Sequence, residues 1–265
     1  MANNQVNDTN VDDLLKFLLY VGQAKRTFRT GWILCGVERV ESVADHMYRM
    51  AIMSFLLPSV SDQSKVLCMK LALVHDLSES IVGDLTELDD ISKSEKHRRE
   101  TEAMDYLTRL LPTHVGTEIF SLFNEYVEQK TNEAKLVKDL DIFDMLVQAY
   151  EYEKIQNAYG FLEDFFQNSA NKIKTDIVKK WLKKLIECRS SNNQLQLPFD
   201  SNLNTMLKHV LYDDQRMLIY KLPVSDIREK VNNYISSRAQ DGNPSSSATA
   251  EHSSNPIKNV NDQYD

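Results

Sequence analysis

The apolar residues of the chain recur every three or four positions over long stretches, which is the spacing of amphipathic helices. One stretch begins with a capping-box pattern, Ser42 followed by Asp45, and ends at Pro58, which cannot continue a helix. The stretch at 64–81 is apolar on nearly all sides in its centre, so we expect a helix that is buried among its neighbours. The pattern predicts helices at 12–25, 43–57, 64–81, 94–111, 115–129, 133–157 and 171–189, with two more at 203–220 and 225–237.

The composition agrees with an all-helical fold and suggests four parts of the chain. Only 7 glycines and 6 prolines occur in 265 residues, which disfavours turn-rich sheets. An irregular basic and aromatic segment at 26–41 and a break at Gly83 interrupt the helices, and small polar residues dominate after 237. We therefore predict an all-α protein with a disordered N-terminus at 1–11, a helical bundle at 12–189, a helical extension at 190–237 and a disordered tail at 238–265.

Charge and cysteine usage disfavour several classes of function. The formal net charge is −8 and the isoelectric point is near 5.3, whereas nucleic-acid binding needs a basic surface. The N-terminal segment is polar and acidic, and no apolar run reaches the roughly 18 residues that a membrane span needs. The 3 cysteines are widely spaced, which fits reduced thiols inside the cell. We expect a cytoplasmic protein without a nucleic-acid or membrane partner.

Two polar features in apolar surroundings call for a chemical explanation. His46 shares a predicted helical face with Val43 and Met50, and the pair His75-Asp76 lies near the end of the predicted helix at 64–81. A lone histidine of this kind is more often a hydrogen-bonded core residue, and an isolated His-Asp pair is more often a surface pair. The occurrence of both features in one chain favours a binding partner that they share, because burial of a carboxylate without a partner costs free energy. Imidazole and carboxylate together suit one divalent ion such as Mn, Co, Fe, Zn or Mg.

Further carboxylates are candidates for the same site. Glu79 follows His75-Asp76 at helical spacing, so it would share their face and could transfer protons beside a metal; the alternative is a solvated glutamate. Asp84 follows a glycine that could turn its carboxylate over the site, and the alternative is a turn former. Periodicity does not choose a fourth ligand among three aspartates of the predicted helix at 133–157: Asp139, Asp141 and Asp144.

Five short segments carry a resemblance to a known family. In order, they are Arg29-Thr-Gly-Trp32, Glu41-Ser-Val-Ala-Asp-His46, Ala72-Leu-Val-His-Asp-Leu-Ser-Glu79, Gly83-Asp84 and Val137-Lys-Asp-Leu-Asp141. Together they resemble the HD-domain superfamily, specifically its 5′-deoxynucleotidase branch, the HD-domain-containing protein 2 group. The stretch Glu95-Lys-His-Arg-Arg-Glu100 also resembles that group, and the likeness covers roughly 14–189. The resemblance implies an HD-domain helical bundle with a metal held by His46, His75, Asp76 and Asp141.

The resemblance also implies roles for residues around the metal. Glu79 takes the position of the catalytic glutamate, and Asp84 takes that of a second active-site carboxylate. Arg29 would contact the phosphate, and Trp32 is a substrate-binding candidate in the same segment. Bacterial relatives have a tryptophan directly after the arginine, whereas this chain has Thr30 there, so base or sugar contacts from this segment are an open point.

The activity implied by the resemblance is metal-dependent hydrolysis of deoxyribonucleoside 5′-monophosphates to a deoxynucleoside and phosphate, in a protein that is a candidate homodimer. One alternative keeps the site but changes the reaction, to that of a phosphodiesterase or a nucleoside-triphosphate hydrolase. A two-metal site usually needs more histidines, and the four that remain are scattered, which favours one metal. The other alternative is a non-catalytic helical scaffold that acts through its C-terminal extension.

Overall fold

The computed structural model describes residues 10–190, except 38, 59, 87–88 and 90. The chain divides into two units, Met1–Leu195 and Gln196–Asp265, and all described residues belong to the first. The predicted helices at 203–220 and 225–237, the predicted tail at 238–265 and most of the predicted N-terminal lead lie outside the described residues.

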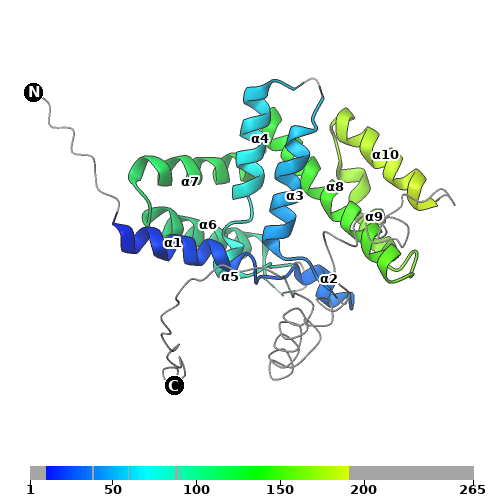
Figure 1. Cartoon of the computed structure of the whole chain (residues 1–265), viewed down its shortest axis with the longest axis horizontal. Coiled ribbons are helices and arrows are strands. Elements are labelled where there is room, and N and C mark those ends of the chain that lie inside the picture. The colour runs from blue at the N-terminus through cyan, green and yellow to red at the C-terminus, as the bar shows by residue number, and fades with distance from the viewer. Residues whose placement is uncertain (1–9, 38, 59, 87–88, 90, 191–265) are drawn as a thin grey trace, which may run out of the picture. The chain divides into compact units, whose positions relative to one another are not determined.

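The described part of the chain is built from helices, which confirms the all-α prediction (Figure 1). Within it, the sole β-type pairing is an isolated antiparallel bridge between Phe28 and Ser42. The elements are α1 Val11–Gln23, α2 Thr30–Leu34, α3 Val43–Phe55, α4 Asp62–Val74, α5 Glu79–Val82, α6 Lys93–Arg109, α7 Thr113–Glu128, α8 Asn132–Ile155, α9 Glu163–Ser169, the 3₁₀ helix η1 Ala170–Lys172 and α10 Asp176–Ser190.

Helix α8 is the central element of this bundle. It packs against α3, α4, α7 and α10 (Figure 1). Buried residues occur around most of its circumference. The sequence pattern pointed instead to the segment at 64–81 as the helix buried on all sides, and that expectation was wrong. In α4, Leu71 is fully buried, but Val66 and Leu73 are 47% and 51% exposed. Helix α4 therefore contributes one face to the core, while α8 is enclosed by its neighbours.

The predicted single helix at 64–81 is broken where the chemistry lies. Helix α4 ends at Val74, a turn follows, and α5 begins at Glu79. In the turn, the backbone N–H of Glu79 donates to the carbonyl of Asp76 at 3.0 Å, and that of Ser80 donates to Leu77 at 3.2 Å. These bonds span three residues rather than four, so the chain is wound more tightly than an α-helix. The tighter winding changes the directions in which Asp76 and Glu79 leave the backbone.

Two short helices lie where the sequence pattern did not predict them. Helix α2 falls in the segment expected to be irregular at 26–41, and α9 precedes the last helix. The carboxylate of Asp84 accepts a hydrogen bond of 2.6 Å from the backbone N–H of Thr30, the first residue of α2. Five-residue helices are too short to produce a readable apolar period, so a partner distant in sequence determines where this one starts.

Candidate metal centre

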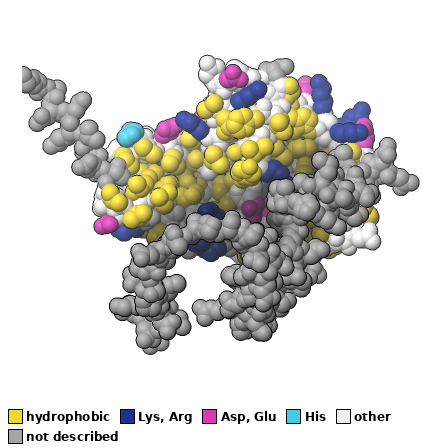
Figure 2. All heavy atoms as spheres, viewed as in Figure 1, with side chains coloured by type: hydrophobic (Ala, Val, Ile, Leu, Met, Phe, Trp, Pro, Cys, Tyr) yellow, Lys and Arg dark blue, Asp and Glu magenta, His cyan; other side chains and the backbone are white. Residues whose placement is uncertain are grey.

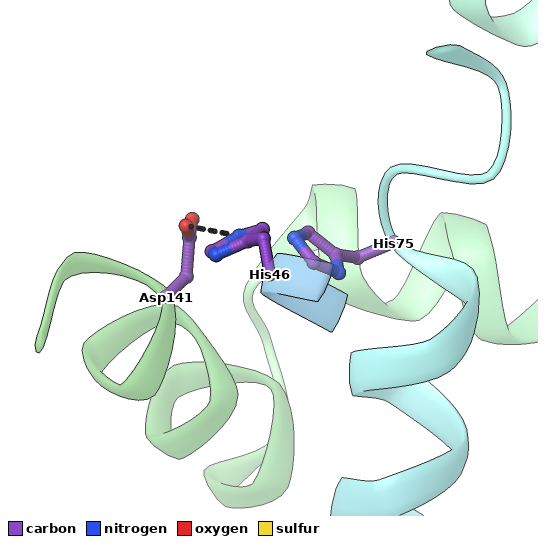
Figure 3. Close-up of side chains that lie close together, drawn as sticks. All are labelled: His46, His75 and Asp141. Carbon is purple, nitrogen blue, oxygen red and sulfur yellow. Dashed lines mark ion pairs between the residues drawn. The ribbon is translucent and has the colours of Figure 1, made fainter. Parts of the chain in front are cut away.

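Three separate elements bring histidine and aspartate side chains to one point. His46 comes from α3, His75 from the turn after α4, and Asp141 from α8, and they point toward one another (Figure 3). One potential ligand atom from each of these three residues lies within 4.8 Å of the others. Ligands of one divalent ion lie roughly 3–4 Å apart, because each is about 2 Å from the metal. The spacing therefore fits a single ion.

The two histidines each present one free ring nitrogen to this point. Nδ1 of His75 donates to the carbonyl of Ala72 at 2.9 Å, which leaves Nε2 facing the cluster. Nε2 of His46 lies 3.3 Å from Oδ1 of Asp141, and Nε2 of His75 lies 3.0 Å from Oδ2 of Asp76. Neither Nε2 atom makes an aligned hydrogen bond, although both are buried. A buried nitrogen without a partner is costly, and coordination of a cation would satisfy both.

Asp76, the fourth predicted ligand, lies in the turn beside the two histidines. Its Oδ2 lies 3.9 Å from Nε2 of His46 and 3.4 Å from Nη1 of Arg29. Burial opposes ionisation of Asp76, but the imidazole of His75 beside it and the charge of Arg29 hold its pKa below the usual range. Asp76 is therefore a carboxylate, as a metal ligand must be.

Asp141 is oriented by two neighbours that the sequence reasoning missed. Its Oδ2 accepts from the hydroxyl of Tyr126 at 2.7 Å and from Nζ of Lys138 at 2.8 Å, which leaves Oδ1 toward His46. The Tyr126 ring also packs on His75, with ring centroids 4.8 Å apart. Lys138 precedes Asp141 by three residues, so helical spacing could have identified it. Tyr126 comes from α7, and no local pattern marks it.

Glu79, Asp84 and Arg29 lie beside the histidine–aspartate cluster. Arg29 is largely buried, and its Nη1 is 3.9 Å from Oδ1 of Asp84. Glu79 is 3% exposed, and its Oε2 has no hydrogen-bond partner. Burial, followed by the charges of Asp76 and Asp84, raises the pKa of Glu79 well above its ordinary value. The cluster thus has beside it a buried carboxyl group with one unpartnered oxygen, and a guanidinium.

The structure does not bring Trp32 to the cluster. Its side chain is 2% exposed, and its indole N–H donates to Glu41 at 2.9 Å. The ring packs against Phe165 and Tyr152, with centroid distances of 4.4 and 5.5 Å. A side chain enclosed in this way offers no surface to a ligand, so its position is at odds with the predicted substrate contact.

The three candidate aspartates of α8 have three different environments. Asp141 belongs to the cluster. Asp139 is 2% exposed and accepts from the backbone N–H groups of Lys174 and Thr175 at 3.0 and 2.6 Å, just before α10 begins. Asp144 is fully buried and accepts from Nδ1 of His46 at 2.6 Å. Asp139 thus holds a helix start, and Asp144 lies behind the histidine.

His46 titrates at an unusual pH in this environment. Burial and the positive charge of Arg29 favour the neutral ring, but the nearby carboxylates of Asp141 and Asp144 outweigh them and raise the pKa of His46 to about 9. The negative charges around His46 therefore attract a proton when no other cation is present, and a divalent metal would compete for the same place.

Over the described residues, the fold and the site together define a helical bundle with a buried cluster of the donors that hold divalent metals. A family model described as HD domain matches residues 21–181, and the chain belongs to this family. The 5'-deoxynucleotidase HDDC2 of Xenopus laevis is 48% identical over 178 residues, which cover 67% of this chain and 88% of that protein. The 5'-deoxynucleotidase YGK1 of Saccharomyces cerevisiae is 41% identical over 182 residues, covering 67% of this chain and 83% of that protein.

A solved structure agrees with the assignment of the fold. A conserved hypothetical protein from Pyrococcus furiosus superposes with a TM-score of 0.52 at 33% identity, covering 66% of this chain and 98% of that one. In the part of the chain that the structure describes, none of the helices has the length and apolar character of a membrane span. The cytoplasmic location stays a prediction.

Proposed function

We propose that this chain is a metal-dependent 5′-deoxynucleotidase that hydrolyses deoxyribonucleoside 5′-monophosphates to a deoxynucleoside and phosphate. The observation that carries the proposal is the pair of buried, unpartnered Nε2 atoms of His46 and His75 beside the Asp141 carboxylate. Relatives at 41% and 48% identity that carry the name 5'-deoxynucleotidase support the reaction and the substrate.

The proposed metal ligands are His46, His75, Asp76 and Asp141. Two imidazoles and two carboxylates suit a divalent ion of the group Mn, Co, Fe, Zn and Mg, and this donor set does not choose among them. When bound, such an ion would stabilise negative charge on phosphoryl oxygens and lower the pKa of a nearby water.

Arg29 is the proposed phosphate-binding residue. Its guanidinium is 3.4 Å from Asp76 and 3.9 Å from Asp84, so it lies at the edge of the ligand cluster with its charge shared between two carboxylates. A guanidinium presents several N–H donors in a plane, which matches the oxygens of a phosphate. In this place, Arg29 would bind the monoester and neutralise charge that develops as its phosphorus–oxygen bond breaks.

Glu79 and Asp84 are the proposed proton-transfer groups. Attack of water on phosphorus forms one P–O bond and breaks the bond to the 5′ oxygen, so a proton must leave the water and another must reach the departing oxygen. Glu79 has a free carboxyl oxygen in a buried position, which suits a group that both accepts and donates a proton. Asp84 already accepts from the backbone of Thr30, so its role includes holding α2, and Arg29 with it, against the site.

Phosphate release across nucleotide classes tests the proposed reaction. After treatment with a chelator and addition of Mn²⁺, Co²⁺ or Mg²⁺, the protein should release phosphate from dAMP, dCMP, dGMP and dTMP. The chelated protein should release none, because the charge that stabilises the phosphoryl oxygens is gone. Colorimetric detection of inorganic phosphate measures both.

The same assay separates the other reactions that an HD-domain site supports. Cyclic AMP and dATP serve as parallel substrates, followed by chromatography of the nucleotide products. Turnover of cyclic AMP alone would make the protein a phosphodiesterase, and turnover of dATP alone would make it a triphosphate hydrolase. Absence of bound metal together with absence of metal-stimulated phosphate release would support the scaffold alternative.

We also propose that two copies of the chain associate through an exposed apolar surface on α1, α3 and α4. Figure 2 shows hydrophobic side chains gathered over the region of these helices. Extensive apolar patches of this kind usually mark interaction sites. The exposed residues that define this surface are Val11, Leu15, Leu18, Leu19, Tyr48, Ile52, Phe55, Leu56, Val66 and Leu73.

A charge placed on this surface should weaken the association of two copies. Phe55→Glu is expected to give the mass of a monomer in light scattering at a concentration where the wild-type protein gives that of a dimer, because the glutamate would lose its hydration in the contact. Ile186→Glu, at an exposed apolar residue of α10, is the matched control and should leave the mass unchanged. A wild-type protein that is monomeric at all concentrations would contradict the proposal.

A further inference from the structure

Both ring nitrogens of His46 lie close to carboxylates of α8. Oδ1 of Asp141 lies 3.3 Å from Nε2, and Oδ2 of Asp144 lies 2.6 Å from Nδ1. The two aspartates are three residues apart on one helix, so they share a face and lie along the edge of the imidazole. The contact with Asp144 lies behind the ring, and the contact with Asp141 lies on the side of His75.

The contact behind the ring is enclosed and fully hydrogen-bonded. Asp144 is completely buried, and its second oxygen, Oδ1, accepts from Nε of Arg49. Arg49 is held in turn by Gln148 at 2.7 Å and by Glu151 at 2.8 Å. Each carboxylate oxygen of Asp144 therefore has one donor, His46 or Arg49, and the chain of contacts runs from the surface of α8 to the cluster.

We propose that Asp144, supported by Arg49, is a positioning residue that fixes the ring of His46 with its proton on Nδ1 and its Nε2 aimed at the metal. A carboxylate whose other oxygen is bound by a guanidinium can only accept from the imidazole, so Nδ1 carries the hydrogen. Nε2 is then the nitrogen left to donate its lone pair. The inference rests on the proposed metal site and adds to it a partner that acts through His46 without touching substrate.

His46 and Asp144 also belong, together with Glu41, to a second group of side chains with the spacing of a metal site. Two contacts indicate that this second group stabilises the fold and does not bind a metal. Glu41 accepts from the indole N–H of Trp32 at 2.9 Å, and the guanidinium of Arg49 lies against Asp144. A cation placed there would be repelled by Arg49 at close range. The unpartnered nitrogen of His46 is Nε2, on the other side of the ring.

Replacement of Asp144 by asparagine tests the proposal with little change in shape. Asparagine has one acceptor oxygen where Asp144 has two, so it cannot accept from both Arg49 and His46. If the asparagine oxygen accepts from Arg49, the asparagine amide N–H faces Nδ1 of His46, and the imidazole proton must then lie on Nε2. We expect Asp144→Asn to bind Zn²⁺ about 10- to 100-fold more weakly than wild type, as for other lost partners of metal-binding histidines. Competition with a chromogenic chelator measures the dissociation constant.

Asp139→Asn is the matched control, because Asp139 is also a buried aspartate of α8 but binds backbone N–H groups before α10. It should lower thermal stability while its Zn²⁺ dissociation constant stays within about twofold of wild type. The inference is wrong if Asp144→Asn binds Zn²⁺ as wild type does, or if Asp139→Asn weakens binding equally.

A measurement on the wild-type protein keeps the test decisive if Asp144→Asn does not fold. Nitrogen–proton correlation NMR of the histidine rings should show a proton on Nδ1 of His46 in the Zn²⁺-loaded protein, and also in the metal-free protein at a pH high enough that the ring keeps only one proton. A loaded protein in which Nδ1 of His46 bears no proton would overturn the proposal. If wild type binds no Zn²⁺ at all, the proposed metal site fails, while the metal-free spectrum still reports whether Asp144 holds the Nδ1 proton.

Discussion

His75→Ala is expected to abolish both metal binding and phosphate release. The imidazole of His75 is fixed by the hydrogen bond from Nδ1 to Ala72, and its Nε2 is buried without a partner at the centre of the cluster. Alanine removes a proposed direct ligand, which should weaken binding by more than the roughly 10- to 100-fold that loss of a supporting partner costs. Metal content after dialysis and phosphate release from dAMP are the two measurements.

The matched control for this variant is His97→Ala, at an exposed histidine of α6. It should retain wild-type metal content and turnover, so any loss specific to His75 reports the cluster rather than a general effect of removing histidines. Because His75 also packs on Tyr126, circular dichroism and thermal unfolding of the metal-free variant must show that the bundle is intact. A folded His75→Ala protein with full metal content would contradict the proposed ligand set.

The sequence predicted the helical frame because its apolar spacing is long and regular. The predicted helices at 43–57, 94–111, 115–129 and 133–157 agree with α3, α6, α7 and α8 to within a few residues at their ends. The helix at 64–81 was predicted too long, since apolar periodicity does not reveal the switch to tighter winding after Val74. That switch determines where Asp76 and Glu79 point, so the most chemically important turn was the least visible in the pattern.

The residues of the candidate site also differ in how far the sequence alone could identify them. His75-Asp76 and His46 stood out because each is a polar feature in an apolar stretch, which a single segment reveals. The different environments of Asp139, Asp141 and Asp144 depend on residues from α3, α7 and the segment before α10, so spacing along α8 could not separate them. The enclosure of Trp32 was not visible in the sequence for the same reason, since the rings that pack against it lie more than a hundred residues away in the chain.

Glu79→Gln is expected to bind metal as wild type does but to lose turnover by about 10²- to 10⁴-fold, the usual contribution of a proton-transfer group. Glutamine keeps the volume of the buried side chain but cannot accept or release a proton. The loss should appear in kcat more than in KM, because Glu79 is not among the proposed groups that hold the phosphate. Steady-state phosphate release and metal content of the same preparation provide the measurements.

Glu100→Gln separates proton transfer by Glu79 from a general change in charge. Glu100 on α6 is half-buried. Burial raises its pKa above the ordinary value; the charge of Lys96 lowers it and the charge of Asp76 raises it further. Glu100 therefore shares the electrostatic surroundings of the cluster. Its carboxylate lies 3.5 Å from Lys96, and we expect its replacement to change turnover by less than about tenfold, because an ion pair with a partly exposed lysine contributes little. Equal losses in the two variants would mean that the site needs negative charge rather than a proton carrier. Full activity of Glu79→Gln with bound metal would remove Glu79 from the proposed mechanism and leave Asp84 as the remaining carboxylate for the proton.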